Sequence, residues 1–204
     1  VPGWPVSVIQ LRVGESLADN LAAAAAGVRE ALSTKALLVL LPENFAGMIR
    51  GPDPILVLDA EAPHLDPALA EIVALSRANP HACVVLGGIP VRGDTPASAF
   101  NSLLALRGGE LVARYDKIHL FDATLPDGSV LDESRRTLRG TQLTILEHAG
   151  VRIGLSICYD LRFPEHFAAL ARAGAEVLLV PSAFTVPTGE AHWEVLLRAR
   201  AIEN

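Results

Sequence analysis

Residues 151–165 read VRIGLSICYDLRFPE and pass from an apolar run to a polar turn and then to a proline. The apolar run predicts a buried strand over residues 151–157, and Pro164 suits the first turn of a helix over residues 164–173. A strand followed closely by a helix is a building unit of α/β proteins. The stretch therefore predicts an α/β fold and places Cys158 at a strand-to-helix turn.

Strand and helix patterns alternate along the rest of the chain. Ser16 suits the N-cap of an alanine-rich helix, and Gly108-Gly109 suits a two-residue hairpin turn. There is no internal repeat and no linker-like segment, so residues 1–204 are expected to form one domain. Further strands are predicted at residues 6–11, 36–41, 82–86, 99–106, 111–115, 141–147 and 176–180, and further helices at residues 17–32, 66–78 and 190–204.

The composition is that of a globular, mildly acidic protein: 50% of the 204 residues are hydrophobic, and the net charge is -6. A nucleic-acid partner would need a basic stripe, which the scattered arginines do not form. No apolar run reaches the length of a membrane span, and the N-terminus lacks the features of a signal peptide. The two cysteines form no disulfide framework, which favours a reducing compartment and predicts the cytoplasm.

Two interpretations of Cys158 compete. A cysteine at an arbitrary position is usually a small buried hydrophobe, which is our interpretation of Cys83 in HACVVLGG. Cys158 differs because Tyr159, Asp160 and Arg162 follow it at once, and we expect Asp160 and Arg162 to orient the turn by ion pairing. A thiol there is expected to be exposed and close to a helix N-terminus, which favours the thiolate. This context favours a functional thiol.

Three predicted strands end close to polar residues of catalytic type, namely Glu43, Lys117 and Cys158. In α/β sheets, ligands bind beyond the carboxyl ends of the strands, so these three side chains are expected to meet at one site. Glu43 alone would pass for an ordinary loop carboxylate. In a partly buried site, however, such a carboxylate can act as a general base near neutral pH.

The scarcity of lysine in the sequence indicates a special role for Lys117 at this site. The chain has 17 Lys and Arg residues, of which only Lys35 and Lys117 are lysine. A compact ammonium can approach a thiolate or an oxyanion in a space that a planar guanidinium cannot enter. We therefore predict a role for Lys117 that arginine cannot fill, whereas Lys35 suits a solvated turn.

Four motifs, in this order, resemble the nitrilase superfamily of carbon–nitrogen hydrolases over nearly the whole chain. They stand as LPENF at 41–45, YDKIHLF at 115–121, GLSICYDLRFPE at 154–165 and PSAFTVPTGEAHWEVLLRARAIEN at 181–204. The residues of the last two motifs are most similar to those of the branch that contains ω-amidase and deaminated glutathione amidase. The resemblance implies an αββα sandwich. It also implies that family members continue beyond the position of Asn204, so this domain is expected to lack their C-terminal strands and tail.

The resemblance further implies the chemistry: hydrolysis of a primary amide in a small carboxylate-bearing molecule through a thioester on Cys158. Glu43 is then the general base, and Lys117 stabilises the oxyanion together with the backbone N–H of Tyr159. A second glutamate of the family matches Glu133, so the resemblance implies that the long polar loop over residues 121–140 contributes to the active site. Substrate-binding residues are expected at Tyr159, Phe184 and Thr185. No metal or organic cofactor is implied, and the protein is expected to be a homo-oligomer.

Several alternatives stay open. Another activity of the superfamily (aliphatic amidase, N-carbamoyl hydrolase or nitrilase) or a non-catalytic binding module would share these motifs, although a non-catalytic relative commonly loses one of the catalytic residues. A thiol protease would need a histidine base, and His119 is expected to be structural or to line the site. Metal and nucleotide motifs such as HExxH and GxxxxGK[ST] do not occur. A cation for the substrate carboxylate is expected at Arg135, Arg136 or Arg162.

Overall fold

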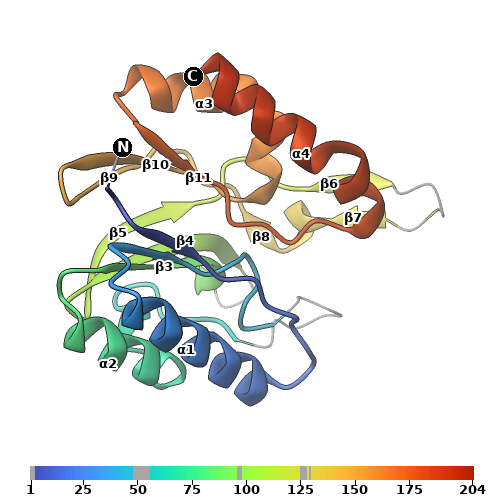
Figure 1. The fold of residues 1–204 in the computed structure, drawn as a ribbon. Coiled ribbons are helices and arrows are strands. Elements are labelled where there is room, and N and C mark those ends of the chain that lie inside the picture. Colours follow the sequence, from blue (N-terminus) through green and yellow to red (C-terminus); the bar gives the residue numbers. More distant parts are fainter. Residues whose placement is uncertain (1–2, 48–55, 96–97, 125–127, 129) are drawn as a thin grey trace.

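The computed structural model describes residues 3–47, 56–95, 98–124, 128 and 130–204, and these form four layers (Figure 1). Helices α1 and α2 cover one face of the larger sheet, a smaller sheet lies against its other face, and α3 and α4 cover the outside of the smaller sheet. The helices are α1 (Leu17–Ser33), α2 (Ala70–Ala78), α3 (Pro164–Arg172) and α4 (Val186–Glu203). This arrangement is the predicted αββα sandwich.

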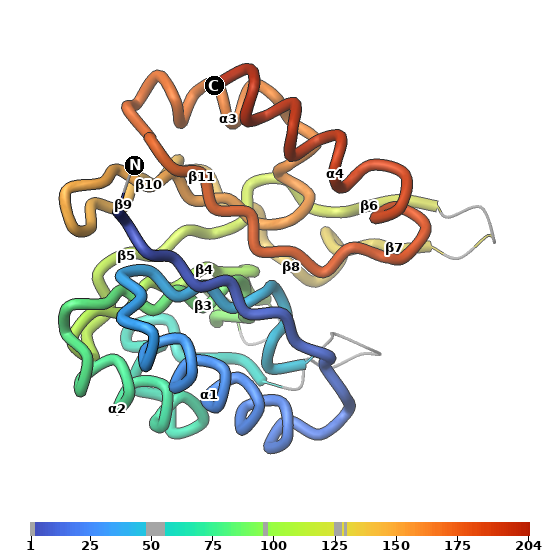
Figure 2. The backbone as a smooth tube through the Cα atoms, viewed as in Figure 1, coloured from blue at the N-terminus to red at the C-terminus, as the bar shows by residue number. Residues whose placement is uncertain are grey.

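Both sheets mix parallel and antiparallel pairs, and the tube in Figure 2 shows how the chain crosses between them. In the larger sheet β1, β2 and β3 are parallel neighbours, whereas β3, β4 and β5 are antiparallel. In the smaller sheet β10 pairs with β9 antiparallel and with β11 parallel. The strands of the larger sheet are β1 (Val6–Val8), β2 (Leu38–Leu40), β3 (Cys83–Arg92), β4 (Ala99–Arg107), β5 (Glu110–Asp116) and β8 (Thr137–Leu138), and those of the smaller sheet are β9 (Ile145–His148), β10 (Val151–Leu155) and β11 (Val177–Leu179).

The apolar run over residues 36–41 is continuous because its two faces belong to different cores. Val39 and Leu41 pack with the helices α1 and α2, whereas Leu38 and Leu40 pack between the two sheets. Side chains of a strand alternate between its faces, so a strand covered on both sides must be apolar at every position. Cys83 lies in the core between the sheets, as predicted.

The predicted hairpin at Gly108-Gly109 and a second hairpin, between β9 and β10, have two-residue turns. Arg107 pairs with Glu110 across Gly108 and Gly109, which both have positive φ. His148 pairs with Val151 across residues 149 and 150, which also have positive φ. Two positive φ angles match the right-handed twist of the flanking strands, and this explains the glycines in the first turn.

Several predicted boundaries were wrong: the strand predicted at 6–11 ends at Val8, the strand predicted at 141–147 begins at Ile145, and the helix predicted at 66–78 begins as an α-helix at Ala70. Three further differences involve β3, α4 and the long loop. β3 extends to Arg92 because a bulge between Leu86 and Ile89 lets it continue past the two glycines. α4 begins at Val186 because proline is tolerated in the first turn of a helix. The long loop over residues 121–140 contains a small sheet of β6 (Asp122–Thr124) and β7 (Val130–Asp132), while residues 125–127 and 129 lie outside the described part.

Helix termini follow the chemistry of capping. The Ser16 side chain accepts a hydrogen bond from the Asp19 backbone N–H and so caps α1. In the C-terminal half of the chain, α3 begins at Pro164 and is followed by Gly174 with a φ of 90°. In the described part of the chain, no helix combines the length and apolar character that crossing a membrane requires.

Candidate active site

The structure brings Glu43, Lys117, Cys158 and Glu133 together between the two sheets. Glu43 follows β2, Lys117 follows β5, Cys158 follows β10, and Glu133 lies in the segment after β7. Lys117 Nζ donates to Glu43 Oε1 at 3.1 Å and to Glu133 Oε2 at 2.9 Å. The Cys158 thiol hydrogen-bonds to the Glu43 carboxylate. Glu43 therefore contacts both the thiol and the ammonium.

The environment of Cys158 corrects the expected exposed thiolate. The residue is only 8% exposed, and it opens the short 3₁₀ helix η4 (Cys158–Arg162) with a left-handed φ of 47°. Burial raises the pKa of the thiol well above its ordinary value, and the Glu43 charge raises it further, whereas the Lys117 charge lowers it. The resting residue is therefore a neutral thiol, which needs a base before it can attack.

Lys117 is the buried cation of the site, with 2% of its residue surface exposed. Burial alone would lower the pKa of its ammonium, but the charges of Glu43 and Glu133 outweigh burial and raise the pKa. Glu133 accepts from Lys117 with both carboxylate oxygens and also accepts the Phe121 backbone N–H at 2.7 Å. Lys117 is thus fully charged and held from two sides.

Asn101 in β4 also belongs to this cluster and was not predicted from the sequence. Its Nδ2 donates to Glu43 Oε1 at 2.9 Å and to Glu133 Oε1 at 3.2 Å, and its backbone oxygen accepts the Lys117 N–H. Its buried Oδ1 has no partner among the described residues. Because an unsatisfied buried acceptor destabilises the fold, the orientation of this amide indicates that donation to both carboxylates is the stronger requirement.

Gly88 makes room for the carboxylate and the amide. Its φ is 141°, and a Cβ there would lie 2.9 Å from Asn101 Oδ1 and 3.0 Å from Glu43 Cγ. The Gly88 backbone oxygen also accepts the Asn44 N–H at 2.9 Å. The glycine in the bulge of β3 therefore allows Glu43 to approach Asn101. The adjacent glycines in the sequence were the only available signal of this close approach.

Two of the expected substrate-binding residues, Tyr159 and Phe184, lie beside Arg162. Its guanidinium lies 5.8 Å from the ring centroids of both Tyr159 and Phe184, and Nη2 lies 3.3 Å from His192 Nδ1. Among the described residues, Asp160 pairs with His119 Nδ1 at 2.7 Å, whereas no carboxylate forms an ion pair with Arg162. Thr185 lies at the N-cap of α4, and its hydroxyl lies 2.7 Å from that of Thr188.

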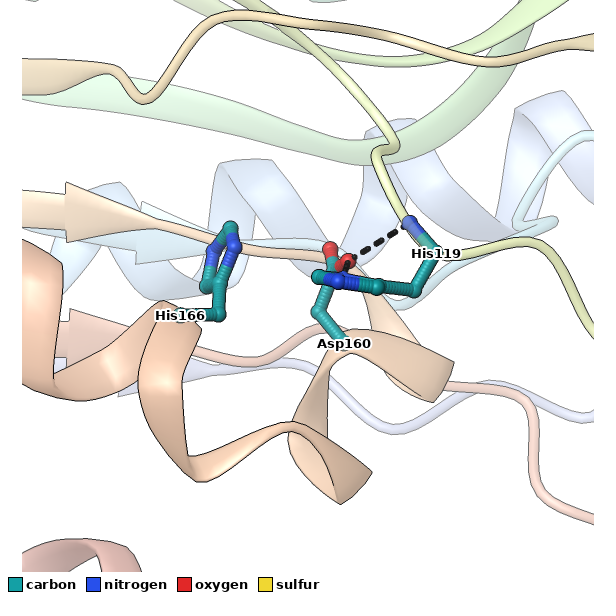
Figure 3. Close-up of side chains that lie close together, drawn as sticks. All are labelled: His119, Asp160 and His166. Carbon is teal, nitrogen blue, oxygen red and sulfur yellow. Dashed lines mark hydrogen bonds and ion pairs between the residues drawn. The ribbon is translucent and has the colours of Figure 1, made fainter.

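His119, Asp160 and His166 form a second polar cluster, to which the segment after β5, η4 and α3 each contribute one side chain (Figure 3). Three such groups could in principle hold a metal ion. Each Asp160 oxygen, however, already has two donors: His119 N and Nδ1 for Oδ1, and Tyr115 Oη and Ile157 N for Oδ2. A metal would have to displace these hydrogen bonds, so the cluster does not fit a metal site.

Comparison with known proteins identifies the family to which this chain belongs. The carbon-nitrogen hydrolase family matches residues 5–204. Deaminated glutathione amidase of Synechocystis sp. is 38% identical over 97% of this chain and 73% of its own length. The human protein of the same name is 41% identical over 98% of this chain and 62% of its own length.

Solved structures give the same result. The C. elegans NitFhit protein superposes with a TM-score of 0.79 at 34% identity, covering 97% of this chain and 48% of that one. An amidase from Nesterenkonia sp. AN1, carrying acrylamide added to its active-site cysteine, has a TM-score of 0.77 at 26% identity and covers 98% of this chain and 74% of that one. The chain belongs to the carbon–nitrogen hydrolase family. The predicted superfamily, sandwich fold and amidase class are confirmed.

Proposed function

We propose that this protein hydrolyses the primary amide of a small carboxylate-bearing molecule through a thioester on Cys158 and releases ammonia. The observation that carries the proposal is the position of Glu43, which contacts the Cys158 thiol and the Lys117 ammonium at once. One buried carboxylate can then take the thiol proton beside a cation ready for the developing oxyanion. The active-site cysteine of the Nesterenkonia amidase and the names of the closely similar amidases support it.

Acylation begins from the neutral thiol. Glu43 takes the proton as the Cys158 sulfur attacks the amide carbonyl and forms the S–C bond. The carbonyl oxygen becomes an oxyanion, which Lys117 Nζ and the backbone N–H of Tyr159 stabilise. Protonated Glu43 then gives its proton to the amide nitrogen, the C–N bond breaks, and ammonia leaves.

Deacylation uses the same groups. Glu43 removes a proton from a water molecule that attacks the thioester carbonyl, and the tetrahedral intermediate is again stabilised by Lys117. The C–S bond breaks, Cys158 takes back a proton from Glu43, and the carboxylic acid is released. Glu133 and Asn101 touch neither sulfur nor substrate in this scheme; they hold Lys117 and Glu43 in place.

The first test is selective alkylation. Iodoacetamide should modify Cys158 much faster than Cys83 in the folded protein and should stop turnover, because Cys158 contacts a base whereas Cys83 lies inside the core. Cys83 is completely buried, whereas Cys158 is 8% exposed, so the reagent reaches Cys158 more readily. Peptide mass spectrometry measures both sites, and an amide substrate should protect Cys158. Equal labelling, or activity after full alkylation of Cys158, would contradict the nucleophile assignment.

The second test concerns the distal carboxylate of the substrate. Arg162 is the arginine that lies beside Tyr159 and Phe184 without a carboxylate partner among the described residues, so we propose that it binds this group. A charge-assisted hydrogen bond contributes about 1.5–3 kcal/mol, or roughly ten- to a hundredfold in kcat/KM. Arg162→Gln should therefore lower kcat/KM for α-ketoglutaramate by that factor and change it little for a neutral amide of the same length.

Arg135→Gln is the matched control, because Arg135 is exposed on the segment after β7. This variant should keep the preference for the carboxylate-bearing amide. If the parent protein hydrolyses both amides equally well, or if Arg162→Gln lowers both activities alike, then Arg162 does not select a carboxylate. The cysteine mechanism would stand in either case.

We also propose that the protein is a cytoplasmic homo-oligomer. Both cysteines are free, which suits a reducing compartment. The exposed apolar side chains Val186, Val195 and Ile202 on α4 support a subunit contact on that helix. A monomeric mass in sedimentation equilibrium would contradict the assembly.

A further inference from the structure

Asp160 is a fully buried carboxylate that the proposed mechanism does not use. It accepts the Tyr115 hydroxyl at 2.7 Å, the Ile157 backbone N–H at 2.8 Å, the His119 backbone N–H at 3.0 Å and contacts His119 Nδ1 at 2.7 Å. Burial alone would raise the pKa of Asp160, but the hydrogen bond from His119, the nearby His166 and the hydrogen bonds from Ile157 and Tyr115 hold the pKa below its usual value. The group is therefore an anion with four donors.

The donors come from two segments, and each segment carries one reacting group. Tyr115 and His119 lie two residues on either side of Lys117, and Ile157 directly precedes Cys158. Figure 3 shows His119 reaching from the segment after β5 to Asp160 in η4. Asp160 thus joins the backbone that carries the ammonium to the backbone that carries the thiol.

The turn at Cys158 needs such support. A left-handed φ at a residue other than glycine costs about 1–3 kcal/mol and persists only where the surroundings hold it. The Asp160 side chain accepts the Ile157 N–H, and the Cys158 N–H donates to the Pro181 oxygen at 3.0 Å. These contacts fix the backbone on both sides of the strained residue.

His119 completes the link through one nitrogen. Since Asp160 is an anion, His119 Nδ1 carries the proton of this hydrogen bond. The imidazole also stacks on Phe163, with ring centroids 3.7 Å apart and an interplanar angle of 13°. The hydrogen bond to Asp160 and the stacking on Phe163 hold the imidazole independently, so different substitutions can remove them one at a time.

We propose that Asp160 and His119 are positioning residues that fix the Lys117 ammonium relative to the Cys158 thiol, so that the rate of the chemical step depends on the His119–Asp160 hydrogen bond. This inference rests on the proposed function, in which those two groups act on one carbonyl. A misplacement of about 1 Å in such a pair can cost about a hundredfold in rate. None of the hydrogen bonds to Asp160 comes from the side chains of Tyr159, Phe184 or Arg162, so substrate binding through these residues should change less than the chemical step.

Two variants of His119 separate the hydrogen bond from the packing. His119→Phe keeps a ring that can stack on Phe163 but has no donor for Asp160. His119→Asn loses the ring but places an amide nitrogen close to the position of Nδ1. We expect His119→Phe to lower kcat by about a hundredfold with little change in KM, and His119→Asn to keep kcat within a few-fold of the parent value.

A readout without turnover accompanies the kinetics, namely the pH dependence of Cys158 alkylation by iodoacetamide. The charged groups that face the thiol are Glu43, which raises its pKa, and Lys117, which lowers it. If Lys117 moves away from the thiol in His119→Phe, the alkylation curve should shift to higher pH, whereas His119→Asn should alkylate like the parent protein. Thermal unfolding of both variants reports any general loss of stability.

The two ideas can fail separately. If the parent protein alkylates selectively but hydrolyses no amide, the proposed function is wrong, and the alkylation curves still test the positioning role. If the parent protein hydrolyses amides and the two variants behave alike in kcat and alkylation, or if His119→Asn loses more activity than His119→Phe, the hydrogen bond does not position the site. The ring stacking would then be the main contribution of His119.

Discussion

Replacing Lys117 with arginine should keep the positive charge but lower kcat by about a hundredfold or more, the usual loss for one oxyanion-stabilising donor. The ammonium lies within 3.1 Å of oxygens from both Glu43 and Glu133 and is almost completely buried. A planar guanidinium is larger and presents its donors in a fixed fork, so it cannot occupy this position without moving the carboxylates. Steady-state ammonia release measures the effect.

Lys35→Arg is the matched control for this substitution. Lys35 is the chain's other lysine and is exposed after α1, so the change should leave both activity and thermal stability close to the parent values. Circular dichroism of Lys117→Arg establishes that the fold persists. If Lys117→Arg hydrolyses amides at nearly the parent rate, a compact ammonium is not required, and the argument from the scarcity of lysine is wrong.

The secondary structure and the α/β class could be predicted from the sequence because their patterns are local, whereas the αββα sandwich was implied by the family resemblance. The continuous apolar run of β2 indicated burial on both faces, and the glycine pair between β4 and β5 indicated a tight hairpin. Proline at the start of α3 and Gly174 after its end marked the helix boundaries. The bulge in β3 was not predicted, since it depends on the close approach of Glu43 from a neighbouring segment.

The site was only partly predictable, for a related reason. Glu43, Lys117 and Cys158 stand in motifs with recognisable local context, whereas Asn101 is an ordinary residue of β4 whose role depends on contacts with distant residues. The exposure of Cys158 was predicted wrongly because the segments that cover it come from elsewhere in the chain, including the backbone at Pro181 and Ala183. Burial of this kind is a property of the tertiary structure and leaves no periodic signal in the sequence.

Buried charge at the site explains why the thiol is neutral at rest. Lys117 lies between two carboxylates, and Asn101 supplies the further donor that both carboxylates share. A thiolate would add a third anion beside the Lys117 ammonium, in a site where Glu43, Lys117 and Cys158 are all buried. Formation of the nucleophile is therefore coupled to proton transfer onto Glu43 during attack.

Because of this coupling, Glu43→Gln should slow amide hydrolysis but should make Cys158 easier to alkylate. Amide hydrolysis should fall by about a hundred- to ten-thousandfold, because a positioned general base contributes that much and Gln cannot accept the proton. Iodoacetamide alkylation, which needs only the thiolate, should shift to lower pH. The shift is toward lower pH because the charge and the hydrogen bond of Glu43 both raise the pKa of Cys158, and the substitution removes the charge.

Glu133→Gln is the matched control for Glu43→Gln. It also removes a carboxylate that contacts Lys117, but Glu133 is not among the groups that shift the pKa of Cys158 most strongly. Its loss of turnover should therefore be smaller, and its alkylation curve should stay closer to that of the parent protein. If both variants lose activity equally, or if alkylation of Glu43→Gln shifts to higher pH, Glu43 supports Lys117 without acting as the base. The thiol proton would then have to leave by another route.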